Sequence, residues 1–205
     1  MRFTRKVSYY LIGERIMDKT KKDRRFKRTQ QQLLCALKEL INTKSIVNIS
    51  VRELAELADV NRATFYLHYR DPYDMLEHLG NEFIDNLKTI LVKDNEGFNP
   101  AKSFVNLYKY VKENYDIAYI LFSPNCDSSF GRHLEKSLEK FCFDSWIVRA
   151  KDDDSRNCDY FSVYLVAGIT ALLEKWVFDG FVESPEEMAK LSQYFMMYGG
   201  KQFWE

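Results

Sequence analysis

Residues 50–76 read SVRELAELADVNRATFYLHYRDPYDML, and this stretch decides the fold. Ser50 and Glu53 have the spacing of a capping box, which predicts a short helix over the letters VRELAELA. The letters DVN supply a turn, and Asn61 is well placed to cap a second short helix, RATFYLHY. An Asp-Pro pair then ends this helix and starts another, because proline is favoured in the first helical turn. Two short helices around a tight turn are typical of a helix-turn-helix.

The second short helix has two faces of different chemistry. Phe65 and Tyr69 are four residues apart, so they share one face, which we expect to be buried. In a helix-turn-helix this helix enters the major groove of DNA, while the helix before it crosses the DNA backbone. We therefore predict a DNA-binding surface from the outward residues of both helices: Ser50, Arg52, Arg62, Ala63, Thr64, Tyr66, Leu67 and His68. The alternative is that Tyr66 and His68 only cover the core from outside.

The whole chain is predicted to be all-α, because it has only 8 Gly and 4 Pro in 205 residues and no strand-like alternation. The letters DNEGFNP, residues 94–100, mark a linker. This divides the chain into a head with a three-helix helix-turn-helix domain, residues 21–93, and a helical body, residues 94–205. We expect about nine helices, at residues 24–42, 51–58, 62–69, 72–92, 101–114, 116–122, 128–149, 157–179 and 185–198.

Charge is distributed unevenly along the chain. The net charge is zero, but residues 1–76 hold 16 Lys and Arg against 9 Asp and Glu, a net charge of +7 that the remainder balances. This distribution indicates an anion-binding head on a body with another task. The alternative is that the basic runs are solvated tails.

Residues 1–20 form a basic extension in front of the head. The letters from Met17, MDKTKKDRRFKR, would be a natural start for such a head. We therefore expect that residues 1–16 either are absent from the native protein or form a flexible basic arm. The extension lacks the long apolar segment of a signal peptide.

The sequence argues against several other classes of protein. The four cysteines are scattered and the three histidines do not cluster with them, so we predict no disulfide framework, metal site or cofactor. No spacing typical of a catalytic site is present, and the chain is not expected to be an enzyme. No apolar run approaches the roughly 18 residues that cross a bilayer. We expect a cytoplasmic protein without a membrane partner.

The stretch at residues 50–76 resembles the tetracycline-repressor-type (TetR/AcrR) transcriptional regulators. The letters LAELADV, NRATFYLHY and DPYDML stand where this family has a capped helix, a tight turn, a reading helix and the start of the next helix. The resemblance covers about residues 24–80. It implies that Thr64, Tyr66 and His68 hold DNA phosphates, that Arg62, Ala63 and Leu67 face bases, and that Arg52 reaches DNA.

Two positions depart from the family pattern. Asp59 replaces the usual glycine of the turn, so the sequence predicts an aspartate in the left-handed conformation, which Asp tolerates better than most residues. Pro72 stands where many members have a lysine that grips a phosphate. We therefore expect part of the backbone grip to come from elsewhere, for example from the basic residues at 21–28.

The C-terminal letters YLVAGITALLEKWVFDGFVESPEEMAKL, residues 164–191, resemble a C-terminal domain of Firmicute regulators of the type associated with dihydroxyacetone-kinase operons. This resemblance implies dimerisation through the last two long helices. Residues 160–178 are apolar nearly all round, so this helix must be covered on every side. We predict a homodimer interface that includes Val163, Ala167, Gly168, Ala171 and Trp176. The alternative is that this helix is the core helix of a monomer.

The family resemblance also implies what the protein does. It predicts a sequence-specific DNA-binding regulator that reads a palindromic operator as a dimer, and repression released by a small-molecule effector is the expected mode. The aromatic side chains of the body could line an apolar pocket for a small apolar or aromatic effector, or they could simply form the core. The alternative function is a co-regulator or activator that a protein partner controls.

Overall fold

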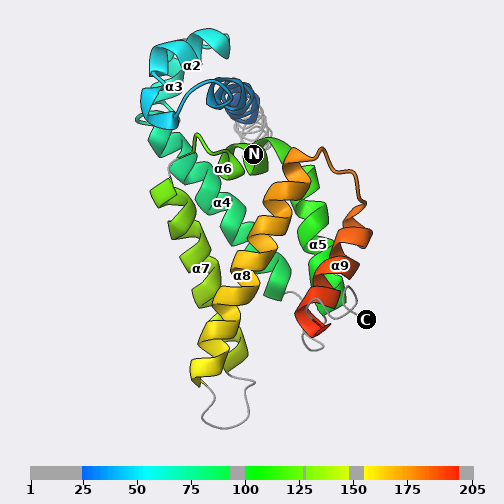
Figure 1. Ribbon diagram of the computed structural model, residues 1–205. Helices are drawn as coiled ribbons and strands as arrows, with labels where there is room; N and C mark the ends of the chain where they lie inside the picture. The colour runs from blue at the N-terminus through cyan, green and yellow to red at the C-terminus, as the bar shows by residue number, and fades with distance from the viewer. Residues whose placement is uncertain (1–24, 93–99, 127, 148–154, 199–205) are drawn as a thin grey trace, which may run out of the picture.

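Figure 1 shows helices throughout the part of the chain that the structure describes. The structure is a computed structural model that describes residues 25–92, 100–126, 128–147 and 155–198. These ranges contain no strand, and nine α-helices lie within them, so the all-α prediction is confirmed. The predicted basic extension and residues 94–99 of the linker lie outside the described residues.

The observed helices follow the predicted ones closely, with most ends within two residues. They are an unlabelled first helix at residues 25–41, α2 (Val51–Leu57), α3 (Arg62–Tyr66), α4 (Pro72–Val92), α5 (Pro100–Glu113), α6 (Tyr115–Phe122), α7 (Ser128–Ile147), α8 (Ser155–Phe178) and α9 (Pro185–Tyr198). A single 3-10 turn, η1 (Ile46–Asn48), was not predicted.

The local signals around the turn act as the sequence predicted. The Ser50 Oγ accepts from the Glu53 N–H, and the Ser50 N–H donates to the Glu53 carboxylate, which completes the capping box of α2. The Asn61 Oδ1 accepts from the Ala63 N–H at 2.8 Å and caps α3. Asp59 has a φ of 53°, the left-handed conformation that the missing glycine required. The turn therefore keeps its geometry with a side chain in place.

One core runs through head and body. In the head, Leu37 and Ile41 of the first helix pack with Leu54 of α2 and Phe65 of α3, all of them fully buried. The buried side chains continue along α4 to the body helices. The long helix α4 therefore packs in both parts, beneath α2 and α3 at one end and beside α5, α6 and α7 further down (Figure 1).

A second link between head and body involves α6 and the loop after it. The Asn125 side chain donates to the Ile41 carbonyl at 2.8 Å, and the Asn125 carbonyl accepts from the Ile46 N–H at 3.1 Å. Lys38 of the first helix forms an ion pair with Asp116 of α6. These contacts hold the base of the head on the body independently of α4.

Candidate nucleic-acid interface

Two buried aromatic side chains set the orientation of α3. Phe65 is fully buried, Tyr69 is nearly so, and their ring centroids are 5.9 Å apart. Leu54 and Ala55 of α2 are buried in the same small core. Because successive residues of a helix point 100° apart, burial of this face leaves the remaining residues of α3 outside.

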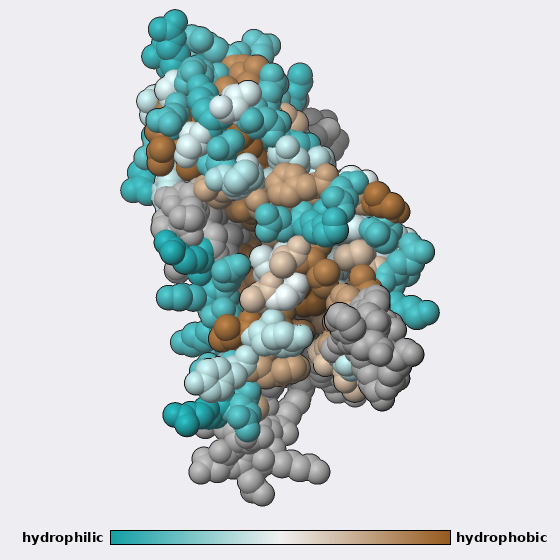
Figure 2. Space-filling model, viewed as in Figure 1, coloured by the Kyte–Doolittle hydropathy of each residue, from teal (hydrophilic) through white to brown (hydrophobic). Residues whose placement is uncertain are grey.

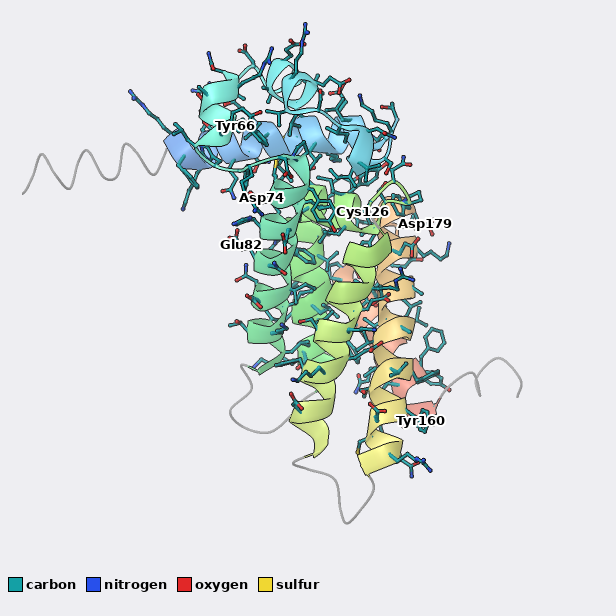
Figure 3. All side chains as sticks on the ribbon, turned by 90° about the vertical axis from the view of Figure 1, so that its left-hand side faces the viewer. Tyr66, Asp74, Glu82, Cys126, Tyr160 and Asp179 are labelled. Carbon is teal, nitrogen blue, oxygen red and sulfur yellow. The ribbon has the colours of Figure 1, made fainter. Side chains whose placement is uncertain are left out.

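The outward face of α3 is the surface predicted for DNA. Arg62 and Ala63 are exposed, Tyr66 is 59% exposed, Leu67 is 82% exposed and Thr64 is half-buried. Figure 3 shows Tyr66 on the head, at the opposite end of the molecule from Tyr160 near the start of α8. A short helix with this exposure can enter a major groove.

The two predicted contacts from α2 are exposed but already paired within the head. The Arg52 Nε donates to the Glu56 Oε1 at 2.8 Å on an open surface, a pair that contributes little stability and that a phosphate could replace. The Ser50 hydroxyl donates to the Glu53 carboxylate at 2.8 Å. Hydrogen bonds from Lys44 and then Ser50 lower the pKa of Glu53 to about 2, so the carboxylate stays charged. A DNA phosphate at Ser50 would therefore compete with the charged Glu53 carboxylate for the Ser50 hydroxyl.

His68 does not lie with the outward residues as predicted. Its ring stacks on Phe26 of the first helix, with centroids 4.1 Å apart, and its Nδ1 is buried without a hydrogen-bond partner. Burial lowers the pKa of His68 below its ordinary value, which favours the neutral ring. The tight last turn of α3, in which the His68 N–H donates to the Phe65 carbonyl at 2.8 Å, directs the side chain back toward the first helix. His68 therefore follows the alternative in which it covers the core from outside.

Arg70 is a charged side chain near α3 for which the sequence predicted no role. Pro72 is buried and cannot bind a phosphate. The side chain of Arg70, two residues earlier in the sequence, is 80% exposed. The Arg70 guanidinium donates to the Asp74 carboxylate at 2.7 and 2.9 Å, and the Arg70 N–H also donates to that carboxylate. Arg70 thus has the charge and the exposure to replace part of the missing lysine contact. Of the basic residues at 21–28, the described ones, Arg25, Lys27 and Arg28, are also exposed.

The predicted dimer residues of α8 divide into two groups. Val163, Ala167, Gly168 and Ala171 are exposed, and a Cβ built at Gly168 would meet no other atom within 4 Å. They lie in an exposed apolar stripe with Tyr160, Phe161, Tyr164 and Phe178. In Figure 2, brown and pale side chains extend along the visible face of α8. A helix side this apolar and this open has the character of an interface.

Trp176 does not belong to this exposed group. Its indole is 1% exposed, and its Nε1 donates to the Glu183 carbonyl at 3.0 Å. Tyr108 and Phe181 pack against it edge to face, with centroids 5.2 and 4.6 Å away. Trp176 therefore anchors α8 to α5 and to the loop before α9 within one protomer, which is the core-helix alternative for this residue.

The comparisons with known proteins cover both halves of the chain. Residues 99–198 match the family model TetR_C_8, described as "Transcriptional regulator C-terminal region". No curated protein matches the sequence. Among solved structures, a TetR transcriptional regulator from Streptococcus agalactiae has a TM-score of 0.57 and 21% identity, over 86% of this chain and 98% of that chain. NalD of Pseudomonas aeruginosa, the secondary repressor of the MexAB-OprM multidrug efflux pump, has a TM-score of 0.60 and 19% identity, over 84% and 97%.

This chain has the fold of a TetR-type transcriptional regulator. The dihydroxyacetone kinase operon activator DhaS is also similar, with a TM-score of 0.54 and 19% identity over 85% of this chain and 97% of that chain. Both resemblances predicted from the sequence are thereby confirmed: the TetR-type head and the DhaS-like C-terminal region.

Many aromatic side chains of this TetR-type body form its core. Tyr108 is fully buried, and its hydroxyl lies 2.6 Å from the Ser192 Oγ of α9. On α6, Tyr115 packs against Phe181 and Tyr119 packs against Phe178, with centroids 5.2 and 5.0 Å apart. These rings join α6 to the end of α8 and the loop after it. Their packing follows the core alternative more closely than the pocket alternative.

Two findings bear on the excluded classes of protein. Within the described residues, no group of three or more His, Cys, Asp and Glu side chains could hold a metal ion. Residues Arg156–Phe178 form the one described helix that is long and apolar enough to cross a bilayer, whereas the sequence predicted no such segment. This helix packs on α7 and α6, and its exposed apolar residues are those of the stripe described above.

Proposed function

We propose that this TetR-type protein is a cytoplasmic homodimer that binds a palindromic DNA operator and represses transcription until a small-molecule effector releases it. The observation that carries DNA binding is the outward face of α3, where Arg62, Ala63, Tyr66 and Leu67 are exposed while Phe65 and Tyr69 fix the helix from behind. These four exposed side chains, a cation, a phenol and two apolar groups, are not needed to fill the core of the head, because Phe65 and Tyr69 already do so.

The exposed stripe of α8 supports the dimer. Two copies of this stripe can bury each other around Gly168 and Ala171, where small residues permit close approach of the helix backbones. A twofold dimer would present two copies of α3, and twofold proteins read half-sites repeated with the same symmetry.

The mode of regulation has two candidates. Repression with release by a small molecule is the common mode of TetR-type regulators, and the similar protein NalD is described as a repressor. Activation, or co-regulation through a protein partner, is the second candidate, because the similar protein DhaS is described as an operon activator. Both modes use the same head, so the DNA-binding proposal does not depend on the choice.

Selection of bound duplexes from a random pool tests the DNA-binding proposal. We expect a palindromic consensus whose affinity falls steeply with salt, by roughly tenfold or more for a fourfold rise in salt. Arg62→Ala and Tyr66→Ala should each weaken binding by about tenfold or more while leaving the fold intact. Arg156→Ala is the control, because it removes the same charge in the first turn of α8, at the far end of the molecule (Figure 1). Full affinity in both head variants would overturn the assigned face.

A reporter gene behind the selected operator distinguishes the two modes of regulation. Repression predicts that expression rises when the regulator is deleted, whereas activation predicts that it falls. Release of the purified protein from labelled operator by individual small metabolites would support the effector proposal. Release only by a co-purifying protein would support the partner alternative.

A further inference from the structure

We infer that Leu67 and Ala63 read thymine methyl groups, so that each operator half-site carries thymines at the positions facing these two side chains. This inference rests on the proposed DNA-binding function and names the base chemistry that the surface recognises. It assigns a sequence preference to the outward face of α3, which was identified above from its exposed side chains.

The first observation is the exposure of Leu67. At 82% it is the most exposed large apolar side chain in the described part of the chain. The carbonyl of Thr64 accepts from the Leu67 N–H at 3.2 Å, so Leu67 is held by the tight last turn of α3 rather than by a loose loop. Folding of the protomer therefore fixes this side chain in water without burying it, and a partner surface would gain by covering it.

The second observation is the position of Ala63. It is exposed and lies four residues before Leu67, so the two side chains share one face of α3. The small Ala63 side chain lets the helix approach a base edge closely, while Leu67 reaches further from the axis. Together they form an apolar strip along the outer face of α3. Arg62 lies next to the N-terminal end of this strip, and Tyr66 lies alongside it.

The third observation is which polar groups the face lacks. Among the exposed side chains of α3 and its caps, only the Arg62 guanidinium has the paired donors that recognise guanine. The Asn61 side-chain oxygen is already used to cap the helix, and His68 stacks inward on Phe26. Paired-donor readout is thus concentrated at Arg62, and beside the Tyr66 phenol the exposed side chains of this face are the apolar Ala63 and Leu67.

The chemistry of the major groove then selects the ligand. The thymine 5-methyl is the apolar group that the four base pairs display there, and cytosine, guanine and adenine offer only polar edges. Opposite any other base, the apolar strip would face polar edges. A thymine methyl gives the strip an apolar partner to bury, beside the polar groups that every base pair displays.

Single thymine-to-deoxyuridine replacements in the selected operator test this inference. Each replacement removes one methyl and keeps every hydrogen bond of the base pair. We expect one or two positions in each half-site to lose about three- to tenfold in affinity for the wild-type protein, measured by fluorescence anisotropy. The same replacements should cost Leu67→Ala much less, because the methyl has already lost its apolar partner. Val182→Ala, at another highly exposed apolar side chain, is the control that should keep the wild-type response.

Two outcomes would overturn the inference. One is an operator whose deoxyuridine form binds the wild-type protein with unchanged affinity, and the other is an undiminished methyl effect in both Leu67→Ala and Ala63→Gly. Neither outcome would contradict the proposed function, because operator binding is measured first and independently. A selection that yields no operator at all would contradict the proposed function and this inference together.

Discussion

The ammonium group of Lys38 lies 2.7 Å from the Asp116 carboxylate, 78 residues further along the chain. The same ammonium lies 3.9 Å from the centroid of the Tyr115 ring, so a carboxylate and an aromatic face hold it together. Tyr115 also packs on Phe181, beyond the end of α8. Helix α6 thus contacts both the head and, through Tyr119 and Phe178, the helix that carries the apolar stripe.

The Lys38–Asp116 pair should contribute measurably to stability. Its side chains are 24% and 30% exposed, so solvent screens them only partly. We expect Lys38→Met and Asp116→Asn each to lower the free energy of unfolding by about 1 kcal/mol, and a double-mutant cycle by urea denaturation to give a coupling of about 0.5–1 kcal/mol. Asp179→Asn breaks the more exposed Lys175–Asp179 pair and should cost under about 0.5 kcal/mol. Additive effects at Lys38 and Asp116 would contradict the coupling.

Gly168 should be a sensitive position for dimerisation. A side chain there meets nothing in the protomer, so Gly168→Glu should leave the helix folded while placing a charge where two stripes would meet. We expect the variant to sediment as a monomer at concentrations where the wild type is a dimer. Asn81→Glu, at an exposed position of α4, adds the same charge elsewhere and should remain dimeric. A dimeric Gly168→Glu variant would remove α8 from the interface.

His68 should make the stability of the protein depend on pH. Burial depresses its pKa in the folded state below the ordinary value of 6.5, so the unfolded state takes up the proton more readily. Its contribution is therefore complete above pH 6.5 and decreases as the pH falls from there through the folded-state pKa. We expect the urea midpoint of the wild type to fall further than that of His68→Phe between about pH 8 and pH 5. His68→Phe keeps a ring for Phe26 and has no proton to gain, and parallel curves would refute the prediction.

Asp59 should prefer glycine to alanine. Its φ of 53° penalises any Cβ, whereas an aspartate side chain partly offsets this penalty locally. We expect Asp59→Gly to change the free energy of unfolding by less than about 0.5 kcal/mol, and Asp59→Ala to lower it by about 1 kcal/mol. At Glu56, inside α2, the order should reverse, with alanine about 1 kcal/mol better than glycine. The same order at both positions would contradict the left-handed turn.

Local chemistry explains what the sequence predicted well. Caps, a proline and helical periodicity act within a few residues, so the ends of α2 and α4 followed from neighbouring residues, whereas the left-handed Asp59 followed from the family pattern, in which a glycine holds this position. The burial of Phe65 and Tyr69 followed from their spacing and left the rest of α3 outside. The TetR-type fold was then recognisable, because this whole pattern is local.

Long-range contacts explain what the sequence could not predict. His68 lies where the family pattern expects a DNA contact, but Phe26, 42 positions earlier in the sequence, covers its ring. Trp176 shares an apolar helix with exposed residues, and only the packing of Tyr108 and Phe181 shows which side it faces. No local signal marked Asn125 as a partner of the head either.

Under the proposed function, the contacts of Asn125 have a consequence for how the DNA target can change. Both of its contacts with the head go to main-chain atoms, the Ile41 carbonyl and the Ile46 N–H, which every amino acid except proline can supply. Side chains on α3, such as Ala63 and Leu67, take no part in this attachment. Gene duplication followed by substitutions on α3 could therefore give proteins with new DNA targets in which the contacts of Asn125 with the head are unchanged.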